Sequence, residues 1–123
     1  MSKIKSRIKR EIEEYITEIK QICPIEKVVL FGSYAKEAID KNSDIDLAIF
    51  SRKITDENRL EFTTKFLVVI TKFKLDIQPI AFSYQDYFDE ENDFIRDEIR
   101  KKGIEIYSAT QEGTMKRGTL LKY

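Results

Sequence analysis

Three aspartates and one Gly-Ser pair are the residues of this chain whose types and spacing could do chemistry. Gly32 and Ser33 close an apolar run, and ten residues later Asp44 and Asp46 enclose a single isoleucine at the start of a second apolar run. Glycine lets the backbone approach a phosphate, and a serine hydroxyl with the first amides of a following helix can donate to phosphate oxygens. Paired carboxylates suit Mg²⁺ or Mn²⁺. The segment therefore predicts a site for a nucleotide and its metal ions.

The spacing of Asp44 and Asp46 fits a β-strand. Alternate side chains of a strand share one face, so the two carboxylates project together while Ile45 and Leu47 point into the core. Carboxylates held in this way can bridge two divalent cations. Two such ions, about 3.5–4 Å apart, can clamp the attacking and the leaving oxygen of an in-line displacement at phosphorus.

A third carboxylate is expected from the segment Lys74 to Gln78. By the same alternation Asp76 and Gln78 face one way, while Leu75 and Ile77 face the core. A carboxylate inside an apolar strand must be hydrogen-bonded, paired or bound to metal, because an isolated buried charge costs several kcal/mol. We interpret Asp76 as a metal ligand, with a salt bridge to a nearby lysine as the alternative.

Other residues near the motif give weaker indications. Lys36 follows Ser33 by about one helical turn and could reach a phosphate, although exposed helical lysines are more often simply solvated. Ser43 precedes Asp44 and need do no more than shape the turn. The Gly-Ser pair is not a Walker loop, because the chain has no G-x-x-x-x-G-K-[ST] sequence.

Composition narrows the chemistry further. The chain has 123 residues, enough for one domain, with 22 basic and 22 acidic residues, so its charge does not demand direct nucleic-acid binding. There is no histidine and a single cysteine, Cys23, which leaves carboxylates, hydroxyls and cations for any chemistry. We expect Cys23 to be a small buried residue. No apolar stretch approaches the ~20 residues of a membrane helix, so we expect a cytoplasmic protein.

Hydrophobic periodicity and turn residues predict an α/β (α+β) domain over residues 1–108, with a flexible tail or partner-binding arm over residues 109–123. Pro79 places the third strand at a sheet edge or ends its pairing. The expected strands are 27–31, 45–50, 74–81 and 104–107. The expected helices are 2–23 with Ser2 as cap, 33–38, 56–72 capped by Thr55, and one long last helix opened by Ser83 and Asp86 and ended by Gly103.

Together these residues resemble the DNA polymerase β-type nucleotidyltransferase superfamily, and specifically its minimal nucleotidyltransferase branch. Gly32-Ser33, ten residues and Asp44-x-Asp46 match the branch signature G-S-x10-D-x-D, and Asp76 lies where a third carboxylate is expected. The resemblance covers about Val28 to Ala81 by motif and residues 1–108 by the order of elements. It implies a small mixed sheet of about four strands flanked by about four helices.

Members of this branch are commonly encoded beside a HEPN-domain ribonuclease toxin and act as its antitoxin, by transferring AMP from ATP to a tyrosine of the toxin. By that resemblance Asp44 and Asp46 would bind two Mg²⁺ ions, and Asp76 would bind the catalytic ion and help to deprotonate the hydroxyl. Gly32 and Ser33 would hold the triphosphate. The chain departs from the commonest pattern at Tyr34 and Lys36, where arginines often stand, which affects the expected phosphate contacts.

Two alternatives stay open at this point. The same metal site could serve a transferase acting on a small molecule, as in the aminoglycoside nucleotidyltransferases, if a second subunit in a homo-oligomer completes the pocket. From another class, the chain could be a binding module that blocks its partner stoichiometrically, with little catalysis.

Overall fold

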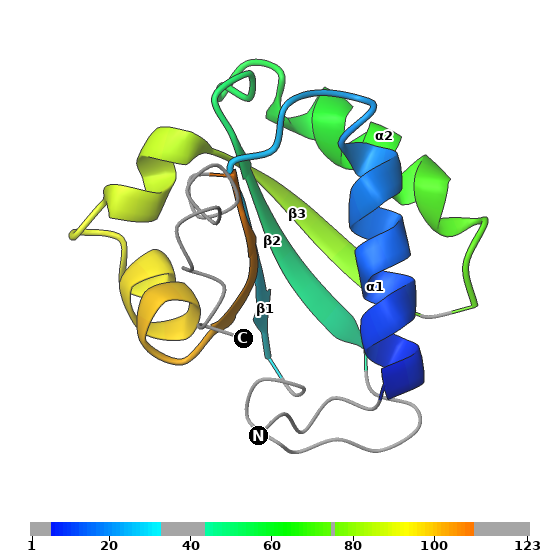
Figure 1. Ribbon diagram of the computed structural model, residues 1–123. Coiled ribbons are helices and arrows are strands. Elements are labelled where there is room, and N and C mark those ends of the chain that lie inside the picture. Colours follow the sequence, from blue (N-terminus) through cyan, green and yellow to red (C-terminus); the bar gives the residue numbers. More distant parts are fainter. Residues whose placement is uncertain (1–5, 33–43, 75, 110–123) are drawn as a thin grey trace.

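A mixed β-sheet forms the centre of the protein, as seen in a computed structural model that describes residues 6–32, 44–74 and 76–109 (Figure 1). The sheet has four strands in the order β3-β2-β1-β4. Their bounds are Lys27–Phe31 for β1, Ile45–Ser51 for β2, Ile77–Ser83 for β3 and Ile104–Ser108 for β4. β1 pairs antiparallel with both β2 and β4, whereas β2 and β3 are parallel. The predicted fold class is confirmed.

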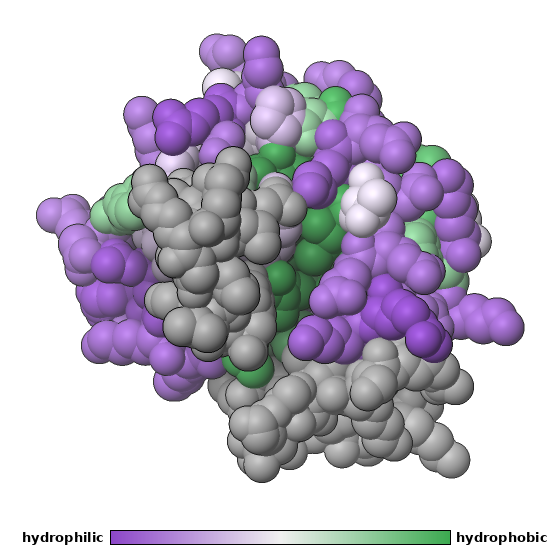
Figure 2. Space-filling model, viewed as in Figure 1, coloured by the Kyte–Doolittle hydropathy of each residue, from purple (hydrophilic) through white to green (hydrophobic). Residues whose placement is uncertain are grey.

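Helices cover both faces of the sheet. The α-helices α1 (Ser6–Ile19) and α2 (Arg59–Ile70) lie on one side, and the 3-10 helix η1 (Tyr84–Phe88) and the π-helix η2 (Phe94–Lys101) lie on the other (Figure 1). Figure 2 shows hydrophilic residues over the outer surfaces of the helices and apolar residues between the two layers. Within residues 6–32, 44–74 and 76–109, no helix has the length and apolar character needed to span a membrane.

The alternation of each strand divides the core into two clusters. Ile45, Leu47 and Ile49 of β2 pack under α1 and α2, as predicted for the first two. Ala48 and Phe50, on the opposite face of the same strand, are also buried and pack with Ile95 and Ile99 of η2. The sheet is therefore buried on both faces, and the face that carries Asp46 is closed by apolar residues farther along β2.

Pro79 lies in β3, which is an edge strand of the sheet. This position was predicted, because proline has no amide hydrogen to donate to a neighbouring strand. The strand begins at Ile77 rather than at residue 74, so Asp76 precedes the strand instead of lying inside it. Ile77 is buried while Asp76 and Gln78 are exposed, which confirms the predicted alternation. Cys23 is a buried free cysteine, also as predicted.

The start of α2 was predicted too early. Thr55 does not cap a helix at residue 56, because its hydroxyl accepts from the Asn58 amide at 3.3 Å while the Asn58 side chain accepts from the Thr55 amide at 2.7 Å. This reciprocal pair closes a turn, and the helix begins only at Arg59. The first helix likewise ends at Ile19, because Ile22 donates back to Ile19 at 2.9 Å in a tight turn. The expected Ser2 cap lies outside the described residues.

The prediction of one long last helix was also wrong, because the structure has two short helices there. The capping box of Ser83 and Asp86 is present, but it opens the short η1, and Asp89 then takes an extended conformation with φ −79° and ψ 102°. The acidic run between Asp89 and Asp93 does not continue the helix, since like charges one turn apart repel. Helical structure resumes in η2. The helix expected at 33–38 lies outside the described residues. So does the tail expected at 109–123, except for Ala109, whose amide donates to the carbonyl oxygen of Glu26 at 2.8 Å.

Candidate functional site

The parallel pairing of β2 and β3 brings two of the three aspartates together. Asp44 directly precedes β2 and Asp76 directly precedes β3, and the register pairs Ile45 with Ile77. The amide of Ile45 donates to the carbonyl oxygen of Asp76 at 2.9 Å. Both carboxylates therefore stand at the same end of neighbouring strands.

Asp46 completes a cluster of three carboxylates. It is half-buried, and its pKa is raised first by that burial and then by the negative charges of Asp44 and Asp76. The pKa of Asp44 is raised by its hydrogen bond to Asp76 and by the charge of Asp76. Each shift means that negative charge is disfavoured here, so a bound cation would stabilise the cluster. That the three carboxylates together form a metal site stays a prediction.

Gly32 leaves the room that the Asp46 carboxylate occupies. Its φ of +78° lies in the left-handed region, and a Cβ at this position would overlap Oδ2 of Asp46 and lie 3.3 Å from its Cγ. The register explains the proximity, because Phe31 at the end of β1 pairs with Asp46. Gly32 was predicted to let the backbone approach a phosphate, and the structure shows a second need for glycine beside the carboxylate.

Gln78 belongs to the site, although the sequence argument gave it no role. Its Nε2 donates to Oδ1 of Asp76 at 3.1 Å. The contact follows from the alternation already noted, because residues two apart on a strand lie on one face. Among the described residues no lysine or arginine forms an ion pair with Asp76, so the salt-bridge alternative gains no support there.

The donor chemistry of the cluster suits hard cations such as Mg²⁺, because all the side-chain donors are carboxylate oxygens. Within the described residues no group of three or more carboxylates or cysteines is arranged to hold a metal ion. The remaining candidates Ser33, Lys36 and Ser43 lie outside the described residues.

With this geometry, the family can be decided from comparison with known proteins. The family model described as "Polymerase beta, Nucleotidyltransferase" matches residues 10–112, which is most of the chain. The chain belongs to this family. The nucleotidyltransferase resemblance predicted from its residues is therefore confirmed.

Solved structures with a similar fold agree with this family. A candidate nucleotidyltransferase from Sulfolobus solfataricus aligns with TM-score 0.58 and 18% identity over 85% of this chain and 84% of that chain. A toxin–antitoxin structure with AMP-PNP aligns with TM-score 0.53 and 18% identity over 90% and 86%. A complex of tri-AMPylated Shewanella oneidensis HEPN toxin with MNT antitoxin aligns with TM-score 0.51 and 17% identity over 94% and 86%. No curated protein sequence matches significantly.

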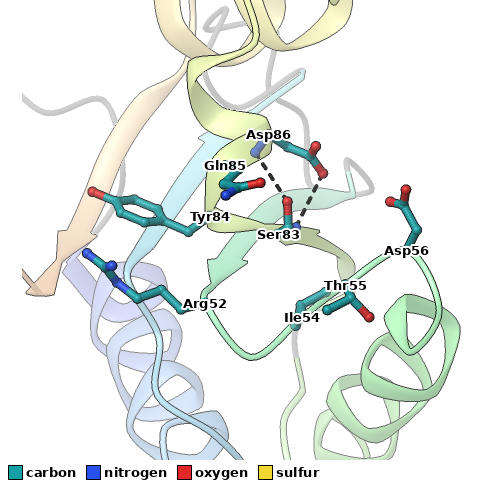
Figure 3. Close-up of a pocket in the computed structure, with 8 residues that line it drawn as sticks. All are labelled: Arg52, Ile54, Thr55, Asp56, Ser83, Tyr84, Gln85 and Asp86. Atoms are coloured by element: carbon teal, nitrogen blue, oxygen red, sulfur yellow. Dashed lines mark hydrogen bonds between the residues drawn. The ribbon is translucent and has the colours of Figure 1, made fainter.

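A surface pocket of this nucleotidyltransferase lies away from the carboxylates. It has a volume of about 460 Å³ and is lined by residues that follow β2 and β3, among them Arg52, Tyr84 and Asp86 (Figure 3). Because the seven residues of β2 separate Arg52 from Asp44, the pocket and Asp44 are about 26 Å apart at ~3.3 Å per residue. The Asp86 amide donates to the Ser83 hydroxyl at 3.2 Å, so part of its polar lining is already paired. The carboxylate cluster is the better candidate for chemistry.

Proposed function

We propose that this chain is a Mg²⁺-dependent protein adenylyltransferase that transfers AMP from ATP to a tyrosine of a HEPN-type toxin and so acts as its antitoxin in the cytoplasm. The observation that carries the proposal is the cluster of Asp44, Asp46 and Asp76 at one end of two parallel strands. In a nucleotidyltransferase such carboxylates are suited to hold the metal ions that neutralise a triphosphate.

In the proposed reaction a tyrosine hydroxyl oxygen attacks the α-phosphorus of ATP. A bond forms between that oxygen and phosphorus, the bond from phosphorus to the bridging oxygen of pyrophosphate breaks, and pyrophosphate leaves. Asp76 accepts the hydroxyl proton. Asp44 and Asp46 would hold both Mg²⁺ ions and Asp76 one of them, and the ions would supply charge neutralisation at the phosphates.

Gly32 and Gln78 position these carboxylates. Gly32 leaves space for Asp46, and Gln78 holds one oxygen of Asp76 through a hydrogen bond of 3.1 Å. An oxygen fixed in this way leaves the second oxygen of Asp76 for the ion or the proton. We propose that Gly32 with Ser33 also contacts the triphosphate, the role expected from the resemblance.

The toxin partner is supported by the complexes whose fold this chain shares. One is described as a tri-AMPylated HEPN toxin with an MNT antitoxin, and another as a toxin–antitoxin with AMP-PNP. Because the Shewanella oneidensis complex is described as holding a tri-AMPylated toxin, we propose that the acceptor tyrosine is presented by the docked toxin itself.

The test uses asparagine at both motif positions. Asp44→Asn with Asp46→Asn keeps side-chain volume while it removes two charges, so the toxin should no longer gain an AMP-sized mass in the presence of Mg²⁺ and ATP. The matched control is Asp56→Asn with Asp93→Asn, which removes two exposed carboxylates outside the cluster and should leave transfer intact. Equal transfer by both double variants would contradict the proposal.

One observation favours a second candidate, a stoichiometric antitoxin with little catalysis. Within the described residues no group of three or more carboxylates or cysteines is arranged to hold a metal ion. The same double variant distinguishes the two functions. If Asp44→Asn with Asp46→Asn still neutralised the toxin fully at equal abundance, binding alone would explain the protection.

A further inference from the structure

The sheet face that carries Asp46 changes from polar to apolar along its length. On β2 this face presents Asp46, then Ala48, then Phe50, and burial increases from the half-buried Asp46 to the two fully buried residues. The residues paired with them on β3 pass in the same order from exposed through half-buried to buried: Gln78, Ile80 and Phe82. A molecule lying along this face would therefore meet carboxylates at one end and apolar side chains at the other.

Phe94, the first residue of η2, lies over the middle of this face. Its ring centroid is 5.3 Å from that of Phe31 on β1 and 6.3 Å from that of Phe82 on β3. The registers place Phe31 level with Asp46, and Phe82 four residues farther along β2. Because β2 lies between β1 and β3, the Phe94 ring spans β2 near Ala48, whose small side chain leaves room for it. Phe94 is thus one side chain away from the carboxylate cluster.

Part of the Phe94 side chain is open to solvent. Phe94 is 37% exposed, whereas Phe31 and Phe82, which hold its ring, are buried. The packing of η2 on the sheet is supplied by Ile95 and Ile99, which are buried in the apolar cluster of this face. A partly open aromatic ring beside a few polar groups is the usual composition of a site for a small ligand.

The direction of the proposed transfer indicates which part of the substrate reaches Phe94. Gly32, the proposed triphosphate contact, follows β1, and Asp76, the proposed proton acceptor, precedes β3. The attacking and leaving oxygens of an in-line displacement lie on opposite sides of the phosphorus, so the line of attack runs across the strands. The nucleoside on the α-phosphorus must then run along the sheet face toward Phe94 or past the strand ends into solvent. Burial of an apolar ring favours the first course.

On the basis of the proposed function, we propose that the nucleobase of ATP stacks on Phe94, with the α-phosphate at the carboxylate cluster. The ribose then lies over the face between them. An aromatic side chain can hold any base in this way, because every base has a π-face. Phe31 meets Phe94 edge-on, with an angle of 87° between the rings, and so supports its orientation. Phe94 is a binding residue for the nucleotide, and the carboxylates carry the chemistry.

Calorimetric titration of the full chain with ATP and Mg²⁺, in the absence of toxin, tests this site. Phe94→Ala should weaken ATP binding about tenfold, the scale of base stacking on an aromatic side chain, whereas Phe94→Tyr keeps the ring and should restore the native affinity. Phe88→Ala is the matched control, because Phe88 is 53% exposed but contacts Tyr84 and Tyr87 on η1. It should leave the affinity for ATP unchanged.

Inorganic tripolyphosphate separates base stacking from damage to the fold. It has the three phosphates of ATP but no base, so Phe94→Ala should bind it with Mg²⁺ as tightly as the native chain does. If Phe94→Ala fails to fold, Phe94→Leu gives the same comparison, because leucine keeps the apolar packing and removes the aromatic face. Native affinity for ATP in a folded variant without the ring, or an equal loss of ATP and tripolyphosphate binding, would overturn the proposal.

Two further outcomes distinguish this site from the proposed transfer. A native chain that binds ATP through Phe94 but leaves the mass of the toxin unchanged would support the stacking site and contradict the transfer. If Phe94→Ala instead bound ATP normally and transferred AMP with a raised KM for the toxin, Phe94 would face the acceptor tyrosine. That result would overturn the assignment of Phe94 to the nucleobase and leave the transfer intact.

Discussion

Gly32→Ala tests two reasons why the site needs glycine at this position, the positive φ of the backbone and the space that the Asp46 carboxylate occupies. The φ of +78° costs an L-residue about 1–2 kcal/mol. The new methyl group would also overlap Oδ2 of Asp46, so the carboxylate must move. We therefore expect a moderate loss of stability together with a much larger loss of activity.

The loss of stability and the loss of activity can be estimated separately. For a domain of 123 residues, about 1 kcal/mol corresponds to roughly 4 °C in Tm, so Gly32→Ala should melt about 4–8 °C lower. A catalytic group misplaced by about 1 Å can cost on the order of 100-fold in rate. Thermal unfolding followed by circular dichroism gives the first number, and the rate of AMP incorporation measured well below the Tm gives the second.

Gly103→Ala is the control for stability alone. A Cβ there would overlap the backbone oxygen of Ile99 and crowd Val29, and neither belongs to the carboxylate cluster. This variant should lose stability to a similar or larger degree while its rate, measured while folded, stays within a few-fold of the native one. If Gly32→Ala melted lower but transferred AMP at the native rate, the positioning role of Gly32 would be refuted.

Three further predictions follow from described contacts. Tyr15→Phe removes the buried hydrogen bond to the Phe66 carbonyl at 2.8 Å and should cost about 1 kcal/mol in urea unfolding. Because burial raises the pKa of Tyr15, the native fold should also lose stability as pH rises above ~10, the unfolded value, and Tyr15→Phe should lose less. Gln78→Ala removes the donor to Asp76 and should slow AMP transfer with little change in Tm, whereas an unchanged rate would show that Asp76 needs no such support. Phe50→Ala empties a fully buried site between β2 and η1, where Phe50 stacks on Phe82 at 5.2 Å, and should cost about 3–5 kcal/mol, so a native-like unfolding midpoint would contradict the packing described.

The strand elements and the carboxylates were predictable because their signals are local. β1 and β4 match their predicted bounds at the start and to within one residue at the end. The period of two around Asp44 and Asp46 sets which residues point into the core, and Pro79 identified the edge strand. Only the parallel pairing of β2 with β3, a long-range property, places Asp76 beside Asp44.

The helices were harder to predict because competing local bonds decide their ends. Thr55 is a good capping residue, but its reciprocal bonds with Asn58 favour a turn. The capping box at Ser83 was read correctly, yet nothing in its pattern tells whether the helix it opens has five residues or twenty. The π-helical bond from Lys102 to Asp97 at 3.1 Å likewise has no signature in the sequence.

The role of Gly32 could be only half predicted. Glycine after a strand indicates a turn or a close approach, but not what approaches. The register that pairs Phe31 with Asp46 shows that the neighbour is a carboxylate of the same site. Ser33, whose proposed triphosphate contact depends on the segment after Gly32, stays a prediction.

The most direct test of the central claim is the intact mass of the cognate HEPN toxin after incubation with this chain, Mg²⁺ and ATP. The carboxylate cluster predicts an increment of one or more AMP units, carried on a tyrosine and absent with Asp44→Asn and Asp46→Asn. A toxin that keeps its original mass while the native chain is folded and bound to it would contradict the assignment of Asp44, Asp46 and Asp76 as a nucleotidyl-transfer site.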